Sequence, residues 1–462
     1  MDSRLARHMV LPFLHGLRRE SVGRYARELN QSQWLAQPAL AAIQLSRLRN
    51  LLSYAFQHHP FYKNRFQEAG FHPADLSSLS DLSRLPLLEK TDVVELSKSI
   101  ICSGPALGRR TKRQTAGSSG RPMVVYADRD TSARSLAARV RFQSWFGILP
   151  GDRQARFWGR PLVQATTLER SKDLLLNRIR IDSSHLNRSA ISNTHDRILG
   201  FRPNYGYGYT SLLLAYAETL SELGLPTSKL DLKAVIFTSE SCLSHQRGLM
   251  SKTFGCPVVP EYGCSEVDII AFGCPHGGFH LNAENVLVEV IPCGDAPPGS
   301  GEVIVTDLNN LMMPLIRYRL GDLAALSGST CSCGRGLPML EHLSGRSQGQ
   351  FILTARGDRV HSQTLAYLFE NLASEGFPLQ QFQIVQLAVG HLRVLIAPEE
   401  VSRADRQIIT DRIQEEATAL LAESCRIEVE FRNDIDGNRE GRKFRHFESL
   451  LPDPHQTDPE IR

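Results

Sequence analysis

A run of glycine and hydroxyl-bearing residues, Thr115–Pro122 (TAGSSGRP), stands directly before the β-rich run Met123–Ala127. The backbone amides and hydroxyl groups of such a loop can surround the phosphates of a nucleotide. The run lacks the G-x-x-x-x-G-K-[ST] spacing of the Walker loop. Glycine and serine are also common in surface turns. The run alone therefore leaves two interpretations open, a phosphate-binding loop and a flexible turn.

Cysteine and histidine gather in two later segments, one with Cys274, His276 and His280 and the other with Cys331 and Cys333. Three thiolates and an imidazole are a ligand set typical of tetrahedral zinc, which would pin two loops near the active face. His280 is the expected fourth ligand, and His276 is the spare. Reduced cysteines packed in loops are the alternative, because this spacing is less specific than paired C-x-x-C knuckles.

Short β-rich runs alternate with helical patterns along most of the chain. Apolar residues at helical spacing predict helices within residues 31–100, with a stop at Pro60. Further on, the pattern predicts helices at Thr131–Phe146 and Ser211–Leu223 and strands at Met123–Ala127, Lys233–Thr238, Val258–Glu261 and Asn285–Ile291. Strands that alternate with helices indicate an α/β body.

A second unit with the order α-β-β-α-β is expected to begin near residue 346. It comprises a helix at Gln363–Leu372, a hairpin of Phe382–Leu387 and His391–Ile396, a helix capped by Ser402, and a strand at Arg426–Phe431. The predicted organisation is therefore a large domain over 1–345, a small domain over 346–451 and a flexible tail over 452–462.

Composition restricts the class of protein. The 462 residues are 42% hydrophobic and 22% charged, as in ordinary soluble domains. The net charge of +4 excludes a strongly basic nucleic-acid binder. No apolar run approaches the roughly 18 residues of a membrane span. The odd number of cysteines, nine, favours a reducing cytoplasm over a disulfide framework.

Arginines concentrate near the N-terminus, at Arg4, Arg7, Arg18, Arg19, Arg24 and Arg27. No secretory signal is expected there, because arginines follow the short apolar stretch and no small-residue cleavage site appears. The segment is compatible with a basic amphipathic membrane helix and with a solvated helix face, and we expect the second.

Five motifs occur in order along the chain: 115–122, Glu261–Glu266 (EYGCSE), Ile316–Asp322 (IRYRLGD), Gly345-Arg346 and Arg442–Arg445 (RKFR). The set resembles the adenylate-forming ligases, which include acyl-CoA synthetases and adenylation domains. Within them it is similar to the phenylacetate–CoA ligase branch, with its relatives from capsule-polysaccharide clusters. Three segments fit that branch particularly: His59–Tyr62 (HPFY), Pro314–Tyr318 (PLIRY) and Cys331–Arg335 (CSCGR). The resemblance covers about residues 45 to 450.

The resemblance implies an α/β fold with a large multi-sheet N-terminal domain and a small mobile α+β C-terminal domain. It also implies an enzyme that uses ATP and Mg²⁺ to form an acyl-adenylate. By its match to the family motif, Lys443 would bridge the carboxylate and the α-phosphate. Glu266 would hold Mg²⁺, and Ser265 would hydrogen-bond the α-phosphate.

The resemblance further assigns a set of residues to the nucleotide. Asp322 would grip the ribose hydroxyls, and Ser239, Glu240 and Ser241 would form the adenine-side loop. The whole nucleotide-binding set is Thr115, Ser118, Ser119, Gly120, Arg121, Ser239, Glu240, Ser241, Glu261, Tyr262, Gly263, Asp322, Arg319 and Arg346. As ordinary loop carboxylates, Glu266 and Asp322 would instead form surface ion pairs.

Two departures from the family pattern bear on function. Arg121 stands where the phosphate loop usually has lysine, which keeps the charge and changes the hydrogen-bond geometry. Gln348 stands where the family usually has an acidic hinge residue, about which the small domain would rotate between adenylation and thioester formation. A neutral residue can still absorb a backbone rotation.

The expected reaction is therefore activation of a carboxylic acid as acyl-AMP and transfer of the acyl group to CoA. An amine, a sugar hydroxyl or a carrier protein is the alternative acceptor, and a non-catalytic nucleotide-binding relative is a further alternative. An aromatic-rich region would suit an aryl or arylacetic acid, although its residues serve equally well as core: Trp145, Phe146, Phe157, Trp158, Tyr205, Tyr207 and Tyr209. No nucleic-acid partner is expected, and a homodimer is left open.

Overall fold

The computed structural model describes most of the chain. The described residues are 1–95, 110–115, 123–158, 166–181, 188–227, 229–240, 242, 244–293, 299–344, 351–356, 359–362, 365, 368–369, 372, 375, 377, 379–398, 401–421, 425–432, 435 and 447–451. The expected phosphate loop from 116 onward, the hinge with Gln348, the segment with Lys443 and the tail from 452 therefore lie outside the described residues.

Within the described residues, the largest sheet has seven strands in the order β4-β3-β5-β6-β7-β8-β9. The first five of these are parallel neighbours, and β8 and β9 are added antiparallel. The predicted strands at 233–238 and 258–261 are confirmed as β6 and β7. The bounds are β3 (Gln154–Phe157), β4 (Arg178–Ile181), β5 (Tyr205–Tyr209), β6 (Ala234–Thr238), β7 (Val258–Cys264), β8 (Asp268–Gly273) and β9 (Phe279–Leu281).

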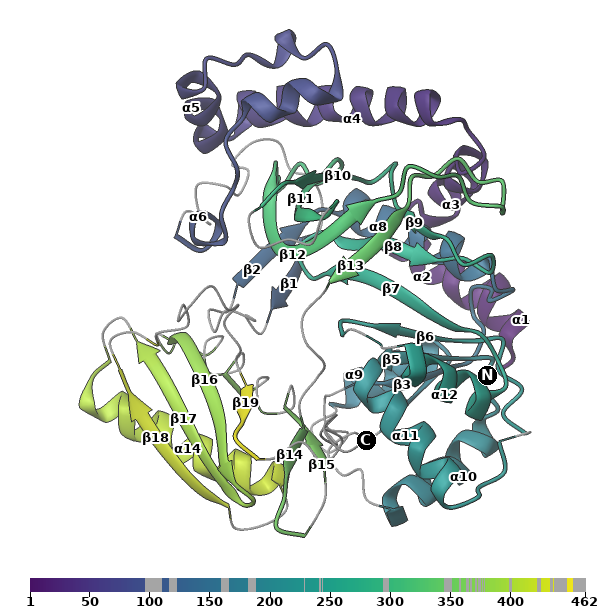
Figure 1. Ribbon diagram of the computed structural model, residues 1–462, viewed down its shortest axis with the longest axis vertical. Coiled ribbons are helices and arrows are strands. Elements are labelled where there is room, and N and C mark those ends of the chain that lie inside the picture. The colour runs from purple at the N-terminus through teal and green to yellow at the C-terminus, as the bar shows by residue number, and fades with distance from the viewer. Residues whose placement is uncertain are drawn as a thin grey trace, which may run out of the picture.

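Helices cover both faces of this sheet (Figure 1). On one face, α3 (Val22–Ser32) and α8 (Arg129–Ser144) pack against residues such as Ile236. On the other face, helices pack against the neighbouring Val235 and Phe237; these are α10 (Arg188–Phe201), α11 (Thr210–Glu222) and α12 (Ser244–Phe254). All five residues of β6 are buried because both of its faces are covered, as expected for a parallel strand.

A second, antiparallel sheet has the order β10-β11-β12-β13. It shares a hydrophobic core with the hairpin β1-β2 and with the helices of residues 37–68. α4 ends at His58 and Pro60 begins the next helix, α5, in agreement with the predicted stop at Pro60. The bounds are β1 (Thr111–Thr115), β2 (Met123–Ala127), β10 (Val286–Ile291), β11 (Gly301–Asp307), β12 (Tyr318–Leu326), β13 (Leu340–Ser344), α4 (Gln37–His58), α5 (Pro60–Glu68), α6 (Lys90–Glu95) and the 3₁₀ helices η2 (Pro73–Asp75) and η3 (Leu79–Arg84).

The C-terminal part has a hydrophobic core of its own, formed by residues between 352 and 447. Its sheet has the order β18-β17-β16-β19, and α14 packs on it. These elements form a separate group in Figure 1. The hairpin, the second helix and the last predicted strand are confirmed, and Ser402 Oγ accepts a hydrogen bond from the Asp405 amide as the predicted cap. The bounds are β14 (Phe351–Leu353), β15 (Arg359–His361), β16 (Leu379–Ala388), β17 (His391–Pro398), α14 (Arg403–Leu421), β18 (Arg426–Phe431) and β19 (Phe447–Ser449).

The chain begins with a helical run of α1 (Ser3–Leu5), a π-helical turn η1 (Ala6–Val10) and α2 (Leu11–Leu17). A further helix, α9 (Thr167–Leu175), precedes β4. None of the helices in the described part of the chain is both long and apolar enough to cross a lipid bilayer.

Candidate active site

Two of the motifs expected to bind the nucleotide are joined by reciprocal hydrogen bonds. Tyr262 of the first motif donates to Asp322 of the second, with 3.0 Å between Tyr262 Oη and Asp322 Oδ2. Tyr318 of the second motif donates to Glu266 of the first, with 3.3 Å between Tyr318 Oη and Glu266 Oε1. All four side chains are buried. The two bonds therefore join the seven-stranded sheet to the four-stranded sheet, and both carboxylates are buried at this junction.

Glu266 lies in the tight turn between β7 and β8, with only 4% of its surface exposed. The turn is narrow because Gly263 packs directly on the next strand: a Cβ atom there would lie 2.4 Å from the carbonyl oxygen of Asp268. Ser265, the neighbour of Glu266, is exposed to solvent. A buried carboxylate beside an exposed hydroxyl at one turn is an arrangement that can hold a hard cation against a phosphate.

Asp322 is buried on β12, whereas Arg319, earlier on the same strand, is half-exposed. Arg319 Nε lies 2.9 Å from Glu89 Oε1, and its Nη1 lies 2.6 Å from Glu302 Oε2. The structure therefore places Arg319 in a half-exposed ion-pair network and does not bring it together with Asp322.

The loop 116–122 lies outside the described residues, but both of its ends are described. Thr115 and Met123 are paired residues of the hairpin β1-β2, so the loop is the hairpin connection. Met123 is buried, and its Sδ lies 3.9 Å from Tyr318 Oη. Because Tyr318 also contacts Glu266, the start of β2 reaches the same place as the two carboxylates.

The expected adenine-side loop follows β6. Ser239 has φ +70°, a left-handed backbone conformation that is uncommon for residues other than glycine. The Glu240 carboxylate accepts a hydrogen bond from the Ser211 amide at 2.7 Å, and the Glu240 carbonyl accepts one from the Thr210 hydroxyl. The Glu240 side chain therefore caps the first turn of α11, and its contribution to this loop is to fix the backbone. Ser241 lies outside the described residues.

Glu261 points away from the Tyr262–Asp322 pair, since the two neighbours Glu261 and Tyr262 lie on opposite faces of β7. Its Oε1 accepts a hydrogen bond from Tyr207 at 2.7 Å, and Arg139 Nε lies 3.8 Å from its Oε2. Burial raises the pKa of Glu261, and the charge of Arg139 opposes that rise. Glu261 thus belongs to the layer between the sheet and α8.

The aromatic residues do not form one cluster. Phe157 and Tyr209 pack on the face of the sheet that α11 covers, while Tyr205 and Tyr207 pack on the α8 face. Trp158 stacks on both Tyr207 and Tyr209, with ring centroids 5.8 and 4.4 Å apart. The tyrosines are buried as core residues, and Trp158 is the aromatic side chain that links the two groups.

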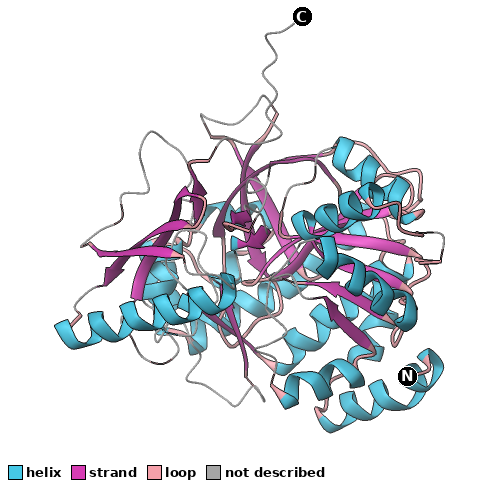
Figure 2. Cartoon of the chain, turned by 90° about the horizontal axis from the view of Figure 1, so that it is seen from below, coloured by secondary structure: helices cyan, strands magenta, loops and turns pink. Residues whose placement is uncertain are grey.

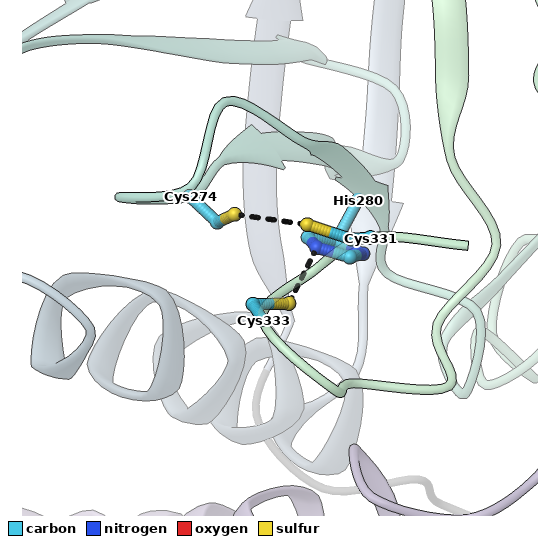
Figure 3. A group of neighbouring side chains, drawn as sticks. All are labelled: Cys274, His280, Cys331 and Cys333. Carbon is cyan, nitrogen blue, oxygen red and sulfur yellow. Dashed lines mark hydrogen bonds between the residues drawn. The ribbon is translucent and has the colours of Figure 1, made fainter. Parts of the chain in front are cut away.

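The four residues expected to bind zinc lie together (Figure 3). One ligand atom from each of Cys274, His280, Cys331 and Cys333 lies within 4.8 Å of all the others. The Cys274 and Cys331 sulfurs are 3.6 Å apart, and Cys333 Sγ is 3.3 Å from His280 Nε2. His276 is exposed and lies outside this group, as predicted for the spare histidine.

Contacts around the cluster orient its ligand atoms. His280 Nδ1 lies 3.2 Å from the Leu337 carbonyl and must donate to it, which leaves the Nε2 lone pair facing the sulfurs. Burial opposes ionisation of Cys333, but hydrogen bonds from Arg335 outweigh it and lower the pKa of this thiol. Burial raises the pKa of Cys274 to about 11. A Cβ atom at Gly278 would lie 2.8 Å from Cys331 Sγ, so glycine is needed there.

The cluster was expected near the active face, but the structure places it away from the carboxylates of Glu266 and Asp322. Cys274 directly follows the last residue of β8, whereas Glu266 precedes the first residue of the same strand. Six residues of strand span roughly 20 Å. Cys331 and Cys333 likewise lie in the loop after β12. The cluster and the tyrosine–carboxylate pairs therefore join the same two sheets at opposite ends.

Sequence reasoning assigned no role to Tyr318. The residue lies within the motif Ile316–Asp322, and a buried tyrosine hydroxyl needs a hydrogen-bond partner. That requirement could have indicated a contact with a carboxylate, although not with which one. Its neighbour Arg317 is structural, since its guanidinium binds both oxygens of Glu289 at 3.1 and 2.9 Å.

No protein-family model matches the chain. The phenylacetate–coenzyme A ligase of Thermus thermophilus is 28% identical over 349 residues, which cover 71% of this chain and 74% of that protein. Protein CapK of Staphylococcus aureus is 24% identical over 289 residues, which cover 61% of this chain and 62% of that protein.

Among solved structures, 2-hydroxyisobutyryl-CoA ligase in complex with 2-HIB-AMP and CoA in the thioesterification state has a similar fold. The TM-score is 0.59 at 21% sequence identity, and the match covers 91% of this chain and 92% of that chain. As the ordered motifs predicted, the chain is similar in sequence to phenylacetate–CoA ligases and shares the fold of a ligase of the adenylate-forming type.

Proposed function

We propose that the protein is a ligase that uses ATP and Mg²⁺ to convert a carboxylic acid to its acyl-adenylate and then transfers the acyl group to CoA. The observation that carries this proposal is the pair of reciprocal bonds that link the motif of Glu266 to the motif of Asp322. The relative from Thermus thermophilus, a phenylacetate–coenzyme A ligase, and the structural neighbour with 2-HIB-AMP and CoA support it.

The proposed first step joins two anions. A carboxylate oxygen attacks the α-phosphorus of ATP, the bond to the bridging oxygen breaks, and pyrophosphate leaves. Catalysis therefore depends on neutralising and aligning negative charge. In this proposal Glu266 holds Mg²⁺, Ser265 contacts the α-phosphate, Asp322 accepts hydrogen bonds from the ribose, and Lys443 bridges the two reacting groups.

Pyrophosphate exchange over a panel of acids tests the proposal. Incubation with ATP, Mg²⁺ and a mixture of aryl and aliphatic acids should yield an acyl-AMP that mass spectrometry identifies. Consumption of CoA then separates thioester formation from transfer to an amine, a hydroxyl or a carrier protein. Absence of exchange with every acid would favour a non-catalytic nucleotide-binding protein.

Replacing Ser118 and Ser119 together by alanine is expected to weaken the use of ATP by roughly a hundredfold in kcat/KM. The reason is that hydroxyl groups bonded to phosphate oxygens form charge-assisted hydrogen bonds. Pyrophosphate exchange at varied ATP measures the effect, with an unchanged melting temperature as the control for folding. An unchanged rate would remove this loop from the site.

We also propose that Cys274, His280, Cys331 and Cys333 hold a structural zinc ion, which would supply folding stability and no chemistry. The support is the common 4.8 Å spacing of the ligand atoms and the orientation of His280 by a carbonyl oxygen. Three ligating thiols need a reducing compartment, which agrees with the expected cytoplasmic location.

Purified protein is expected to contain close to one zinc ion per chain, and Cys331→Ser should lower both the metal content and the melting temperature. The bound ion converts its binding free energy into folding stability. Cys293→Ser, at a half-buried cysteine outside the cluster, is the matched control and should change neither. Metal analysis that finds no zinc in protein prepared without chelator would exclude the site.

A further inference from the structure

Four large apolar side chains stand on successive turns of the N-terminal helical run and face solvent. Leu5, Met9, Phe13 and Leu17 are exposed by 46, 65, 66 and 67%. A spacing of four residues places them along one side of the helix. We call these four residues the apolar stripe. Large apolar side chains that are exposed together, rather than singly, mark an interaction surface.

The opposite side of the same helix is attached to the body of the protein. Ala6 is fully buried. The Arg7 guanidinium donates to the Pro150 carbonyl and to Asp152, both at 2.9 Å. The backbones touch at Gly151, where a Cβ atom would lie 2.8 Å from the Arg7 nitrogen. The helix is thus held in place, and the apolar stripe is its outward side.

Positive charge borders the apolar stripe. Arg4, Arg18 and Arg19 are exposed, and none of them forms an ion pair with another described residue. The neighbouring carboxylates are engaged elsewhere. Asp2 accepts hydrogen bonds from two backbone amides of the first helical turn. Glu20 pairs with His15 at 3.0 Å. The border of the stripe is therefore cationic.

A second exposed apolar segment lies near the end of this helix. In α9, Leu168 and Leu174 are exposed by 78 and 68%. Burial lowers the pKa of Lys172 in the same helix, and the charges of nearby arginines, Arg18 among them, lower it further. Arg18 at the end of α2 therefore lies within electrostatic range of α9. Figure 2 shows the N-terminal helices at the edge of the molecule, with no described element on their outer side in that view.

We infer that the N-terminal helix binds the surface of an anionic lipid bilayer, with the apolar stripe among the acyl chains and its arginines at the level of the phosphates. A helix that lies in the plane of the membrane combines apolar side chains on one side with basic residues around them. This inference goes beyond the ligase activity. It also replaces the expectation of a solvated helix face, because the exposed side carries apolar residues.

The charges favour lipid over a second copy of the chain. A two-fold contact through the apolar stripe would bring the arginines of both copies to one interface. The carboxylates beside these arginines are Asp2, whose Oδ1 accepts two backbone amides, and Glu20, which pairs with His15, so they do not balance the three arginines of each copy. An anionic membrane supplies that opposite charge.

Sedimentation with vesicles tests the inference on the full chain. The protein should sediment with vesicles of phosphatidylcholine mixed with phosphatidylglycerol, and much less with phosphatidylcholine alone. The double variant Met9→Ser/Phe13→Ser should bind the mixed vesicles at least about tenfold more weakly, since it removes two inserted side chains. Added salt and Arg18→Gln/Arg19→Gln should weaken binding without abolishing it.

Leu326→Ser/Ile408→Ser is the matched control, because these exposed apolar residues lie outside the N-terminal helix. It should bind vesicles as the unchanged protein does, and both double variants should keep their melting temperature. Equal vesicle binding by Met9→Ser/Phe13→Ser and the unchanged protein would overturn the inference, as would no vesicle binding at all. A dimer in solution that this variant dissociates, without vesicle binding, would assign the stripe to a second copy.

Discussion

Glu266→Gln is expected to lower acyl-adenylate formation by at least about a hundredfold, or about 2.7 kcal/mol of transition-state stabilisation. Glutamine keeps the shape of the side chain and can still accept the hydrogen bond from Tyr318. It removes the negative charge that would hold Mg²⁺ against the phosphates. Pyrophosphate exchange at saturating acid, measured over a range of Mg²⁺ concentrations, gives the effect.

Tyr318→Phe separates the charge of Glu266 from its positioning. This variant leaves the carboxylate in place and removes the hydroxyl that lies 3.3 Å from it. A loss of about tenfold is expected, because 3.3 Å is long for an O–H···O bond, and such a bond then contributes near the lower end of about 1.5–3 kcal/mol. If Glu266→Gln remains folded and exchanges pyrophosphate normally, Glu266 does not hold the metal.

Lys443→Ala is expected to reduce acyl-adenylate formation by a similar factor, at least about a hundredfold. The substitution removes the cation proposed to lie where the carboxylate and the α-phosphate converge. Given preformed acyl-AMP, the same variant should still transfer the acyl group to CoA at a substantial rate. Rotation of the small domain after adenylation would carry this lysine away from the reacting centre. Pyrophosphate release and thioester formation are measured separately.

Gln348→Pro should have the converse effect. Proline fixes φ at the proposed hinge and blocks the rotation, so the variant should form acyl-AMP and then stall. Equal loss of both steps in folded Lys443→Ala, or full activity in Gln348→Pro, would contradict a rotating small domain. Neither result would affect the assignment of Glu266, which belongs to the large domain.

Elements long enough to show a hydrophobic period could be predicted from the sequence, and strands of three residues could not. The strand at Arg426–Phe431 has its predicted bounds because its apolar residues alternate. The three-residue strands β14, β15 and β19 were not predicted. Too few side chains define a period in them, and their strand geometry depends on pairing with distant residues.

The contacts within the candidate site could not be predicted from the sequence. The motifs named Glu266 and Asp322, but the reciprocal tyrosine bonds that link the two motifs depend on side-chain directions that only the packed sheets determine. Arg319 was grouped with Asp322 because both lie in one motif, and the order of motifs does not determine which way each side chain points. The apolar stripe could not be predicted from the sequence, because helical spacing does not distinguish a side facing the core from one facing solvent.

The alternation along β7 has a consequence for how this protein can change. Glu261 faces Tyr207 and the aromatic layer under α8, and its neighbour Tyr262 faces Asp322 across the other side of the strand. Mutations that reshape the aromatic layer can therefore accumulate on one face of β7 without disturbing Asp322 on the other.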